Sequence, residues 1–481
     1  MTKGLFKKSL TGLILVSIIS TFVLTGCRTK TPAEKKQSYS GIELTYYKVF
    51  DDSDVLDSMI EEYEGSHPGL VINYRQFSDF EEYQKVILNE MAEGEGPDIF
   101  SMPNTWFQSN SRKITPMPEV KGRPEDFNST FVDVAYKDLV NVDQNGKERI
   151  FALPLTVDTL ALYYNKAHFE DRIPERGRPS ETWEGIKEDV AQLIKEDSSL
   201  GRFEVAGIAL GRADNIDRAV DILYLLFLQY GVNFYNDDMS KAIFAGQQGN
   251  VTAYPGLESM EFFTSFADES QKHYTWNEFM ANEVGKETES FAKGQVSMIV
   301  GYSYTYADIV NQMNLWDQKG IDVIDESDIG IAAIPQIYDP DISKDKRVTY
   351  ASYFAETVSR NTKNPEIAWD FLIELSKKEN LEDYFEKTNK PTSRRDMIED
   401  QKKDPIYGVF ASQVGYAESF PILDYYYYRE LFADAIAKLN NSEDGENSLL
   451  DVQNKITELL PAEGLLVEEK VQDESEADVE E

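Results

Sequence analysis

Hydrophobic and polar positions along the chain follow two different periods in turn. Residues 42–47 alternate apolar and polar side chains, which is typical of a strand, and apolar side chains over residues 55–63 then recur at helical spacing. Residues 70–74 return to the strand pattern, and a further helix and strand follow up to residue 102. Because strands alternate with helices, the pattern predicts an α/β fold with a largely parallel sheet.

Two later segments extend this pattern. Ile186 and Val190 lie at helical spacing after Thr182, a residue type that often caps a helix, and residues 207–210 then read as a short strand. Residues 219–228 are apolar on nearly every side, which predicts a buried helix. The 481 residues also exceed the about 250–300 at which a single hydrophobic core stops growing, so we expect at least two lobes.

The first 26 residues have the pattern of an export signal. Three lysines precede an apolar run over residues 10–24, which is shorter than the about 20 residues that cross a bilayer. Residues 24–27 read Leu-Thr-Gly-Cys and resemble a bacterial lipobox, in which Cys27 would carry a diacylglycerol thioether. Cys27 is the only cysteine, so we expect no disulfide or catalytic thiol in the mature domain. An ordinary cleaved signal and an uncleaved anchor are the alternatives.

Composition separates both ends of the chain from its body. Residues 27–40 are polar and rich in Lys, Thr and Pro, which fits a flexible tether. The acidic residues 463–481 are expected to form a disordered, solvated tail. The formal net charge of −38 repels nucleic acid, so we expect no nucleic-acid partner.

The residues that catalysis and metal binding require are sparse. The three histidines are far apart and form no zinc motif, and the chain has no nucleotide-binding or nucleophile-elbow motif. Residues 141–146 begin like a calcium loop, but the Asn145-Gly146 turn between apolar runs favours a hairpin. Acid pairs such as Asp51-Asp52 could serve a glycosidase, although a solvated face is the simpler interpretation. We therefore expect a non-catalytic protein without a cofactor or metal.

Aromatic residues are abundant, and some lie where α/β proteins bind ligands. Most are expected in the cores. A smaller group falls at the ends of expected strands or at junctions between loops and helices, where α/β sheets bind ligands. Flat rings beside Asp and Asn suit a polyhydroxylated ligand. This group comprises Trp106, Tyr302, Tyr304, Tyr306 and residues 425–428.

Six short segments between residues 42 and 460 carry recognisable motifs. In order along the chain they are residues 95–99 (EGPDI), 152–166 (with ALP and LALYYNK), 182–184 (TWE), 291–298 (FAKGQVSM), 329–335 (IGIAAIP) and 364–375 (NPEIAWDFLIEL). This series resembles the family 1 extracellular solute-binding proteins of ABC importers, the group that includes the maltose-binding protein. Ser297 stands where that family usually has alanine.

The resemblance implies two α/β lobes, each with a central, largely parallel sheet flanked by helices, joined by a hinge. Lobe 1 would comprise residues 41–155 and 335–362, and lobe 2 would comprise residues 156–334 and 363–462. The chain would cross between the lobes where these ranges meet. The resemblance also implies that a ligand binds in the cleft and closes the lobes, and that ABC permease subunits recognise the closed form.

Ligand-binding positions also follow from the resemblance. Trp106 and Tyr304 would stack on the ligand from opposite lobes, and Asp158, with Asp51, would accept hydrogen bonds from its hydroxyl groups. Tyr304 stands where maltodextrin binders carry Trp, and residues 215–218 align poorly. The resemblance therefore leaves the identity of the sugar open. The alternative is that both rings lie in the core and that Asp158 caps a strand end. The full set of expected ligand-binding residues is Phe50, Asp51, Asp52, Asn104, Thr105, Trp106, Asp158, Asn215, Arg218, Tyr304 and Tyr426.

Together these features predict a lipid-anchored substrate-binding subunit of an ABC importer on the extracytoplasmic face of the cell membrane. We expect a monomer that binds a small-molecule solute, a mono- or oligosaccharide, and passes it to a permease. The alternatives are a binding protein for a peptide, polyamine or polyol, a secreted carbohydrate-active enzyme that uses two cleft carboxylates, and a surface adhesion or sensor protein.

Overall fold

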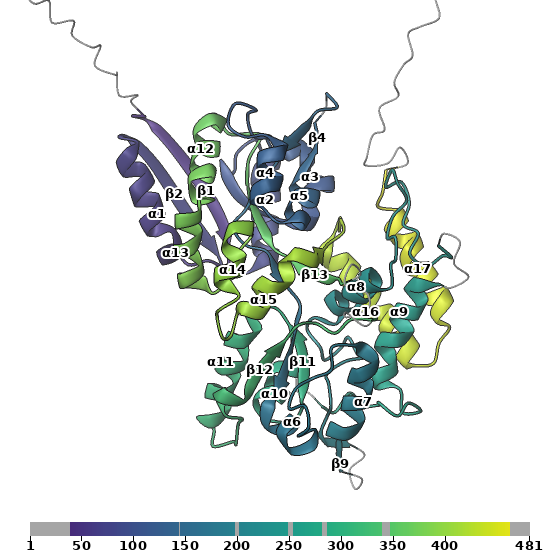
Figure 1. Ribbon diagram of the computed structural model, residues 1–481. Helices are drawn as coiled ribbons and strands as arrows, with labels where there is room; N and C mark the ends of the chain where they lie inside the picture. The colour runs from purple at the N-terminus through teal and green to yellow at the C-terminus, as the bar shows by residue number, and fades with distance from the viewer. Residues whose placement is uncertain are drawn as a thin grey trace, which may run out of the picture.

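The computed structural model describes residues 39–143, 145–197, 202–248, 254–280, 286–338 and 347–461. The expected signal, Cys27, nearly all of the tether and the acidic tail lie outside the described residues. The described chain forms two lobes of mixed α/β structure, the first at the upper left of Figure 1 and the second at the bottom and along the right side, each with its own hydrophobic core. The expected two-lobed α/β fold is confirmed.

Lobe 1 is built on a five-stranded sheet with the order β2-β1-β3-β14-β6. β1 runs parallel to β2 and β3, whereas β14 runs antiparallel to β3 and β6. The strands are β1 (Ile42–Val49), β2 (Leu70–Phe77), β3 (Ile99–Pro103), β6 (Leu153–Pro154) and β14 (Phe354–Val358). The helices are α1 (Ser53–Ser66), α2 (Phe80–Ala92), α3 (Phe107–Asn110), α4 (Pro124–Thr130), α5 (Asp133–Leu139), α12 (Pro365–Leu375), α13 (Lys378–Thr388) and α14 (Ile398–Gln401).

Lobe 2 has a three-stranded sheet in which β8 lies between β11 and β12. β8 runs antiparallel to both neighbours, so the expectation of a largely parallel sheet is wrong for this lobe. Alternation along the sequence does not reveal which strands become neighbours. The strands are β8 (Ala161–Asn165), β9 (Lys195–Asp197), β10 (Arg202–Val205), β11 (Met298–Gly301) and β12 (Ile329–Ala332). The helices are α6 (Lys166–Arg172), α7 (Trp183–Leu193), α8 (Ala219–Gln229), α9 (Pro255–Thr264), α10 (Lys286–Ala292), α11 (Thr305–Asp317), α16 (Tyr425–Asn440) and α17 (Gly445–Thr457).

Several local predictions are confirmed. All side chains of α8 from Ala219 to Phe227 are buried in the core of lobe 2. Thr182 caps α7 by accepting a hydrogen bond from the backbone N–H of Gly185 at 3.1 Å. β4 (Val140–Val142) and β5 (Glu148–Ile150) form the expected antiparallel hairpin. No helix in the described part of the chain is long and apolar enough to cross a membrane.

Three chain crossings join the lobes at a small sheet with the order β15-β13-β7. β13 (Thr349–Ser352) runs antiparallel to β7 (Asp158–Thr159) and parallel to β15 (Ala417–Glu418). Figure 1 shows β13, together with α15 (Gly408–Gln413), between the two lobes. The segments that connect the lobes therefore lie beside one another.

Two of the expected lobe boundaries are wrong. Ile334 and Ile337 pack in the core of lobe 2, so the second crossing comes at β13 and not at residue 335. α12 and α13 pack in the core of lobe 1 beside α1, so the third crossing comes near β15 and not at residue 363. An amphipathic pattern predicts that a helix buries one face, but it does not say which sheet covers that face.

Candidate functional site

Aromatic rings gather on the lobe 1 side of the boundary between the lobes. The ring of Phe50, just after β1, lies 5.9 Å from the ring of Phe354 at the start of β14. Phe354 in turn lies 5.5 Å from Phe80, the first residue of α2. Phe80 also stacks on Tyr426 of α16, in lobe 2, with the ring centres 6.1 Å apart. The rings therefore connect one lobe with the other.

The row of rings continues into lobe 2. The ring of Tyr426 lies 5.4 Å from that of Tyr425, whose hydroxyl oxygen accepts a hydrogen bond from the Arg218 guanidinium at 3.4 Å. This guanidinium lies 5.5 Å from the centre of the Tyr304 ring. We call the whole row the aromatic strip, and it comprises Phe50, Phe354, Phe80, Tyr426, Tyr425, Arg218 and Tyr304.

Three rings of the aromatic strip are open to solvent. Phe50 is 52% exposed, Tyr304 is 41% exposed and Tyr426 is 37% exposed. Aromatic side chains supply large apolar faces, and exposed apolar patches bordered by polar groups often mark binding sites. The strip therefore offers rings from both lobes on which a ligand can stack.

Backbone geometry holds the Phe50 ring at the surface. Phe50 has a φ of 72°, in the left-handed region that bulky residues rarely occupy. Its backbone N–H donates a hydrogen bond to the Phe77 carbonyl at 2.8 Å, which fixes the turn. Such strained residues persist where their surroundings determine them, and they cluster at ligand sites.

A buried ion network lies beneath this turn. The Lys48 ammonium lies 3.3 Å from the Asp51 carboxylate and also pairs with Glu356. Asp51 further pairs with Lys390 and accepts a hydrogen bond from the Tyr384 hydroxyl. Burial alone raises the pKa of Asp51, but the charges of Lys48 and Lys390 outweigh it and hold the pKa below its usual range. We expected Asp51 to bind a ligand, whereas its carboxylate is bonded within lobe 1.

Asn104 is likewise bonded within the protein. Its amide nitrogen donates to the Asp138 carboxylate at 2.9 Å, and its amide oxygen accepts from the backbone N–H of Tyr353 at 3.3 Å. Asp138 also accepts hydrogen bonds from the Tyr353 hydroxyl at 2.8 Å and the Ser419 hydroxyl at 2.6 Å. Burial raises the pKa of Asp138 to about 6. Asn104 thus fixes the crossing segments rather than presenting a free polar group.

Asp158 positions the turn that carries Tyr304. Its carboxylate accepts hydrogen bonds from the Ser303 backbone N–H at 3.1 Å and the Ser303 hydroxyl at 2.6 Å, and from the Thr159 N–H at 2.8 Å. Burial raises the pKa of Asp158 to about 6, although these hydrogen bonds oppose the shift. The arrangement matches the alternative in which Asp158 caps a strand end.

A second buried carboxylate supports the lobe 2 part of the strip. Asp221 accepts a hydrogen bond from the Tyr302 hydroxyl at 3.1 Å and lies 3.9 Å from the Arg218 guanidinium. The Tyr302 ring stacks on Tyr304 at 5.7 Å. The side chain of Arg218 is 32% exposed, so part of the guanidinium faces solvent. Arg218 and Tyr304 are therefore held in place from below.

The other expected residues lie beside or beneath the strip. Trp106 is only 2% exposed and packs against Phe80 at 5.6 Å, so we no longer expect it to stack on a ligand. Asn215 accepts from the Trp276 indole at 2.8 Å and donates to a backbone carbonyl, which makes it part of the interior. Asp52 is an exposed N-cap residue of α1. The Thr105 carbonyl accepts from the Ile422 N–H at 3.3 Å, a hydrogen bond between the lobes.

Sequence reasoning missed two members of the strip, Phe80 and Phe354. Phe80 could have been predicted from the sequence. It directly follows Asp79, a helix-capping residue at the end of the loop after β2. Ligands in α/β proteins bind at such strand ends. Phe354 gave no comparable signal, since it starts a strand.

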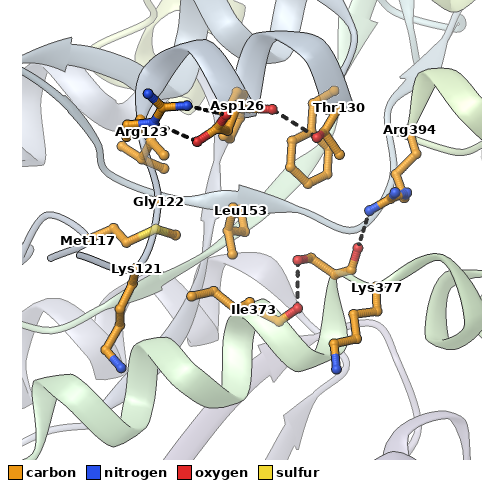
Figure 2. A pocket seen from close by; sticks show the side chains of 14 residues that line it. Met117, Lys121, Gly122, Arg123, Asp126, Thr130, Leu153, Ile373, Lys377 and Arg394 are labelled. Carbon is orange, nitrogen blue, oxygen red and sulfur yellow. Dashed lines mark hydrogen bonds and ion pairs between the residues drawn. The ribbon is translucent and has the colours of Figure 1, made fainter. Parts of the chain in front are cut away.

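Figure 2 shows a separate cavity of about 210 Å³ within lobe 1. Its lining includes Leu153, Ile373 and two arginines whose hydrogen bonds are already made. Arg123 pairs with Asp126 at 2.9 Å, and Arg394 donates to the Ser376 carbonyl at 3.0 Å. No member of the aromatic strip lines this cavity, so it is not part of the candidate site.

The aromatic strip offers stacking faces together with the polar groups of Arg218, Tyr304 and Tyr425. Flat rings contact the C–H faces of a ligand, and the guanidinium and hydroxyl groups hydrogen-bond to its polar atoms. Within the described ranges, no group of three or more His, Cys, Asp or Glu side chains is placed to hold a metal ion. The arrangement suits recognition of a ligand with both apolar and hydroxylated surfaces.

The chain matches a known protein family. The family described as bacterial extracellular solute-binding protein matches residues 58–408, which is more than half of the chain.

Solved structures of similar fold include the sugar-binding protein MalE of Xanthomonas citri, with a TM-score of 0.67 and 14% identity over 87% of this chain and 97% of that one. The cyclic α-maltosyl-1,6-maltose binding protein of Arthrobacter globiformis has a TM-score of 0.65 and 16% identity over 89% and 99% of the two chains. A solute-binding protein of Thermotoga lettingae, bound to α-D-tagatose, has a TM-score of 0.62 and 18% identity over 87% and 99%. At these identities the likeness concerns the fold.

Proposed function

This chain belongs to the bacterial extracellular solute-binding proteins, and from that premise we propose that it captures a carbohydrate on the aromatic strip and delivers it to an ABC permease. The observation that carries this proposal is the run of exposed rings from both lobes beside the partly exposed guanidinium of Arg218. Sugars present C–H faces to rings and hydroxyl groups to polar side chains, so the strip matches their chemistry. In this assignment Phe50, Tyr304 and Tyr426 stack on the ligand, and Arg218 hydrogen-bonds to it.

Several proteins of the same fold support the choice of carbohydrate. Their structures hold α-D-tagatose, maltotetraose or maltose. These ligands range from one sugar unit to four, so the fold accommodates several lengths. The length of the sugar that this chain binds therefore depends on the residues of the aromatic strip.

A ligand screen tests the proposal. The purified domain is heated with single sugars and oligosaccharides and, in parallel, with peptides, polyamines and polyols. Because a ligand at about 100 times its Kd adds roughly 2.7 kcal/mol to the free energy of unfolding, a true ligand raises the melting temperature clearly. Stabilisation by a sugar supports the proposal, and stabilisation by a peptide or polyamine alone contradicts it.

Two further measurements separate the remaining alternatives. Intact ligand recovered after long incubation supports a binding protein, whereas cleaved sugar supports the enzyme alternative. If the ligand draws the lobes together about the crossing segments, solution scattering shows a smaller radius of gyration in its presence. An unchanged radius contradicts closure.

We also propose that a lipid on Cys27 anchors the protein on the extracytoplasmic face of the membrane. Two or more acyl chains give stable anchoring, since each buried methylene contributes about 0.8 kcal/mol. Cys27→Ser should therefore move the protein out of the membrane fraction or leave it unprocessed. Unchanged membrane partition contradicts the anchor but leaves the ligand assignment intact.

A further inference from the structure

A second cavity, of about 340 Å³, adjoins the aromatic strip in lobe 2. We call it the lobe 2 pocket. It shares Arg218 and Tyr304 with the strip, and its other lining residues include Glu287 of α10 with Asp308, Asn311 and Gln312 of α11. Its volume is at the lower end of the about 300–1,000 Å³ of small-molecule sites, so it suits one ring-sized group. A ligand stacked on Tyr304 would meet this pocket at its end.

Several carboxylates line the lobe 2 pocket. Glu287 is only 3% exposed, and its carboxylate accepts from the Asp217 backbone N–H at 3.0 Å. Asp217 also lines the pocket and pairs with Lys286 at 2.7 Å. Carboxylate oxygens accept hydrogen bonds, so this lining favours an occupant that donates them.

The charge balance indicates what kind of donor fits. Three carboxylates, those of Asp217, Glu287 and Asp308, line the pocket with the guanidinium of Arg218, and Lys286 pairs with Asp217, so Glu287 and Asp308 remain as the acidic groups of the pocket. Burial, and then the charge of Asp217, raise the pKa of Glu287 to about 7, whereas the charge of Arg218 lowers it. Hydrogen bonds between an ammonium and a carboxylate are roughly twice as strong as those between neutral groups. A cationic group would therefore gain more here than a neutral hydroxyl.

We propose that the lobe 2 pocket receives the terminal unit of an oligosaccharide and that this unit is an amino sugar with a protonated amine. The proposal rests on the proposed function and deepens it, because it names the length and charge of the ligand. The inner unit lies on the aromatic strip, and the amine of the terminal unit faces the carboxylates of Glu287 and Asp308.

Titration calorimetry at neutral pH tests the proposal with glucosamine, its β-1,4-linked dimer and the neutral dimer cellobiose. The glucosamine dimer should bind at least about tenfold more tightly than cellobiose. Asn311→Trp fills the pocket and should weaken the glucosamine dimer by about tenfold while changing cellobiose less. Asn314→Trp is the matched control, since Asn314 is an exposed asparagine of the same helix that does not line the pocket.

A charge variant tests the amine separately. Asp308→Asn keeps the size of the side chain and removes its charge, so it should reduce the preference for the glucosamine dimer over cellobiose severalfold. Asp317→Asn, at the exposed end of α11, is the control and should leave the preference unchanged.

The outcomes distinguish this inference from the proposed function. Equal binding of the two dimers, or equal effects of Asn311→Trp and Asn314→Trp, overturns the pocket assignment. Binding of another sugar with no response to either dimer also overturns it, while the proposed function stands. If no carbohydrate of any kind binds, the proposed function itself fails.

Discussion

The two lobes differ in which groups they bring to the surface of the aromatic strip. In lobe 1 the charged groups are buried and paired with one another, as Lys48 and Glu356 are, and mainly rings reach the surface. In lobe 2 carboxylates such as Asp221 are also buried beneath the strip, but a charged group, Arg218, reaches the surface beside Tyr304. In the proposed site, lobe 1 would therefore supply a preorganised apolar platform, and lobe 2 would supply the hydrogen bonds that select a ligand.

The largest expected effect comes from breaking the buried network of lobe 1. Lys48→Met leaves the Glu356 carboxylate, which is fully buried, without its cation. Removing one partner of a buried ion pair costs about 3–5 kcal/mol, so the free energy of unfolding should fall by that amount. Denaturant titration measures it. Lys402→Met breaks an exposed pair with Glu399 and should cost less than about 1 kcal/mol. A similar small loss for both variants would contradict the comparison.

A second prediction contrasts two buried carboxylates through their pH dependence. Asp51 is paired with cations, whereas Asp158 is held by neutral donors and its pKa is raised from 3.8 to about 6. Because the folded state then binds more protons than the unfolded state between these values, the contribution of Asp158 to stability is lost as pH rises from about 4 to about 6. A shift of this size corresponds to roughly 3 kcal/mol at most.

Asp158→Asn tests this prediction because asparagine does not titrate. The difference in unfolding free energy between the variant and the wild type should change steadily across this pH window, as measured by denaturant titration at several pH values. Asp317→Asn, which removes an exposed carboxylate, controls for the loss of one charge. A difference that is flat from pH 4 to pH 6 would show that Asp158 does not titrate there.

A third prediction concerns affinity and tests whether the Tyr304 ring of lobe 2 binds the ligand. Tyr304→Ala removes a ring that is 41% exposed, so the ligand-free protein should keep nearly its full stability. Aromatic anchors often carry most of a binding energy, and the affinity for the sugar found by screening should fall by about ten- to hundredfold. Calorimetry measures the affinity, and Tyr254→Ala, at an exposed tyrosine outside the strip, is the control. Loss of stability with unchanged affinity would assign Tyr304 to the core.

The fold was largely predictable because its signals are local. Periodicity predicted the buried helix α8 from residues close together in the chain, and the chain length predicted at least two lobes. The antiparallel pairing of β8 and the placement of α12 depend on which segments meet in space. No local pattern carries that information, and those expectations failed.

The site was predictable only in part, for a related reason. Strand-end position and family resemblance both pointed to Tyr304, and the resemblance alone pointed to Phe50; both residues lie in the strip. The same logic favoured Asp51, but a carboxylate at a strand end faces either a ligand or the protein. Its partner Lys390 lies 339 residues away in the sequence. The difference between a ligand-binding acid and a structural one is therefore a long-range property.

The smallest expected effect tests whether the strained backbone that presents the Phe50 ring lowers the stability of lobe 1. Phe50→Gly relieves a positive φ that costs an aromatic residue about 1–3 kcal/mol, whereas glycine adds roughly 0.5–1 kcal/mol of chain entropy to the unfolded state. The contact with Phe354 is also lost, so the net gain in the free energy of unfolding should be at most about 1 kcal/mol. Affinity should fall severalfold, because the exposed ring is gone. Ser442→Gly relieves a similar φ of 62° outside the strip and should stabilise the protein without changing affinity. If Phe50→Gly lowers stability while affinity is kept, the ring serves packing and the platform interpretation of lobe 1 is wrong.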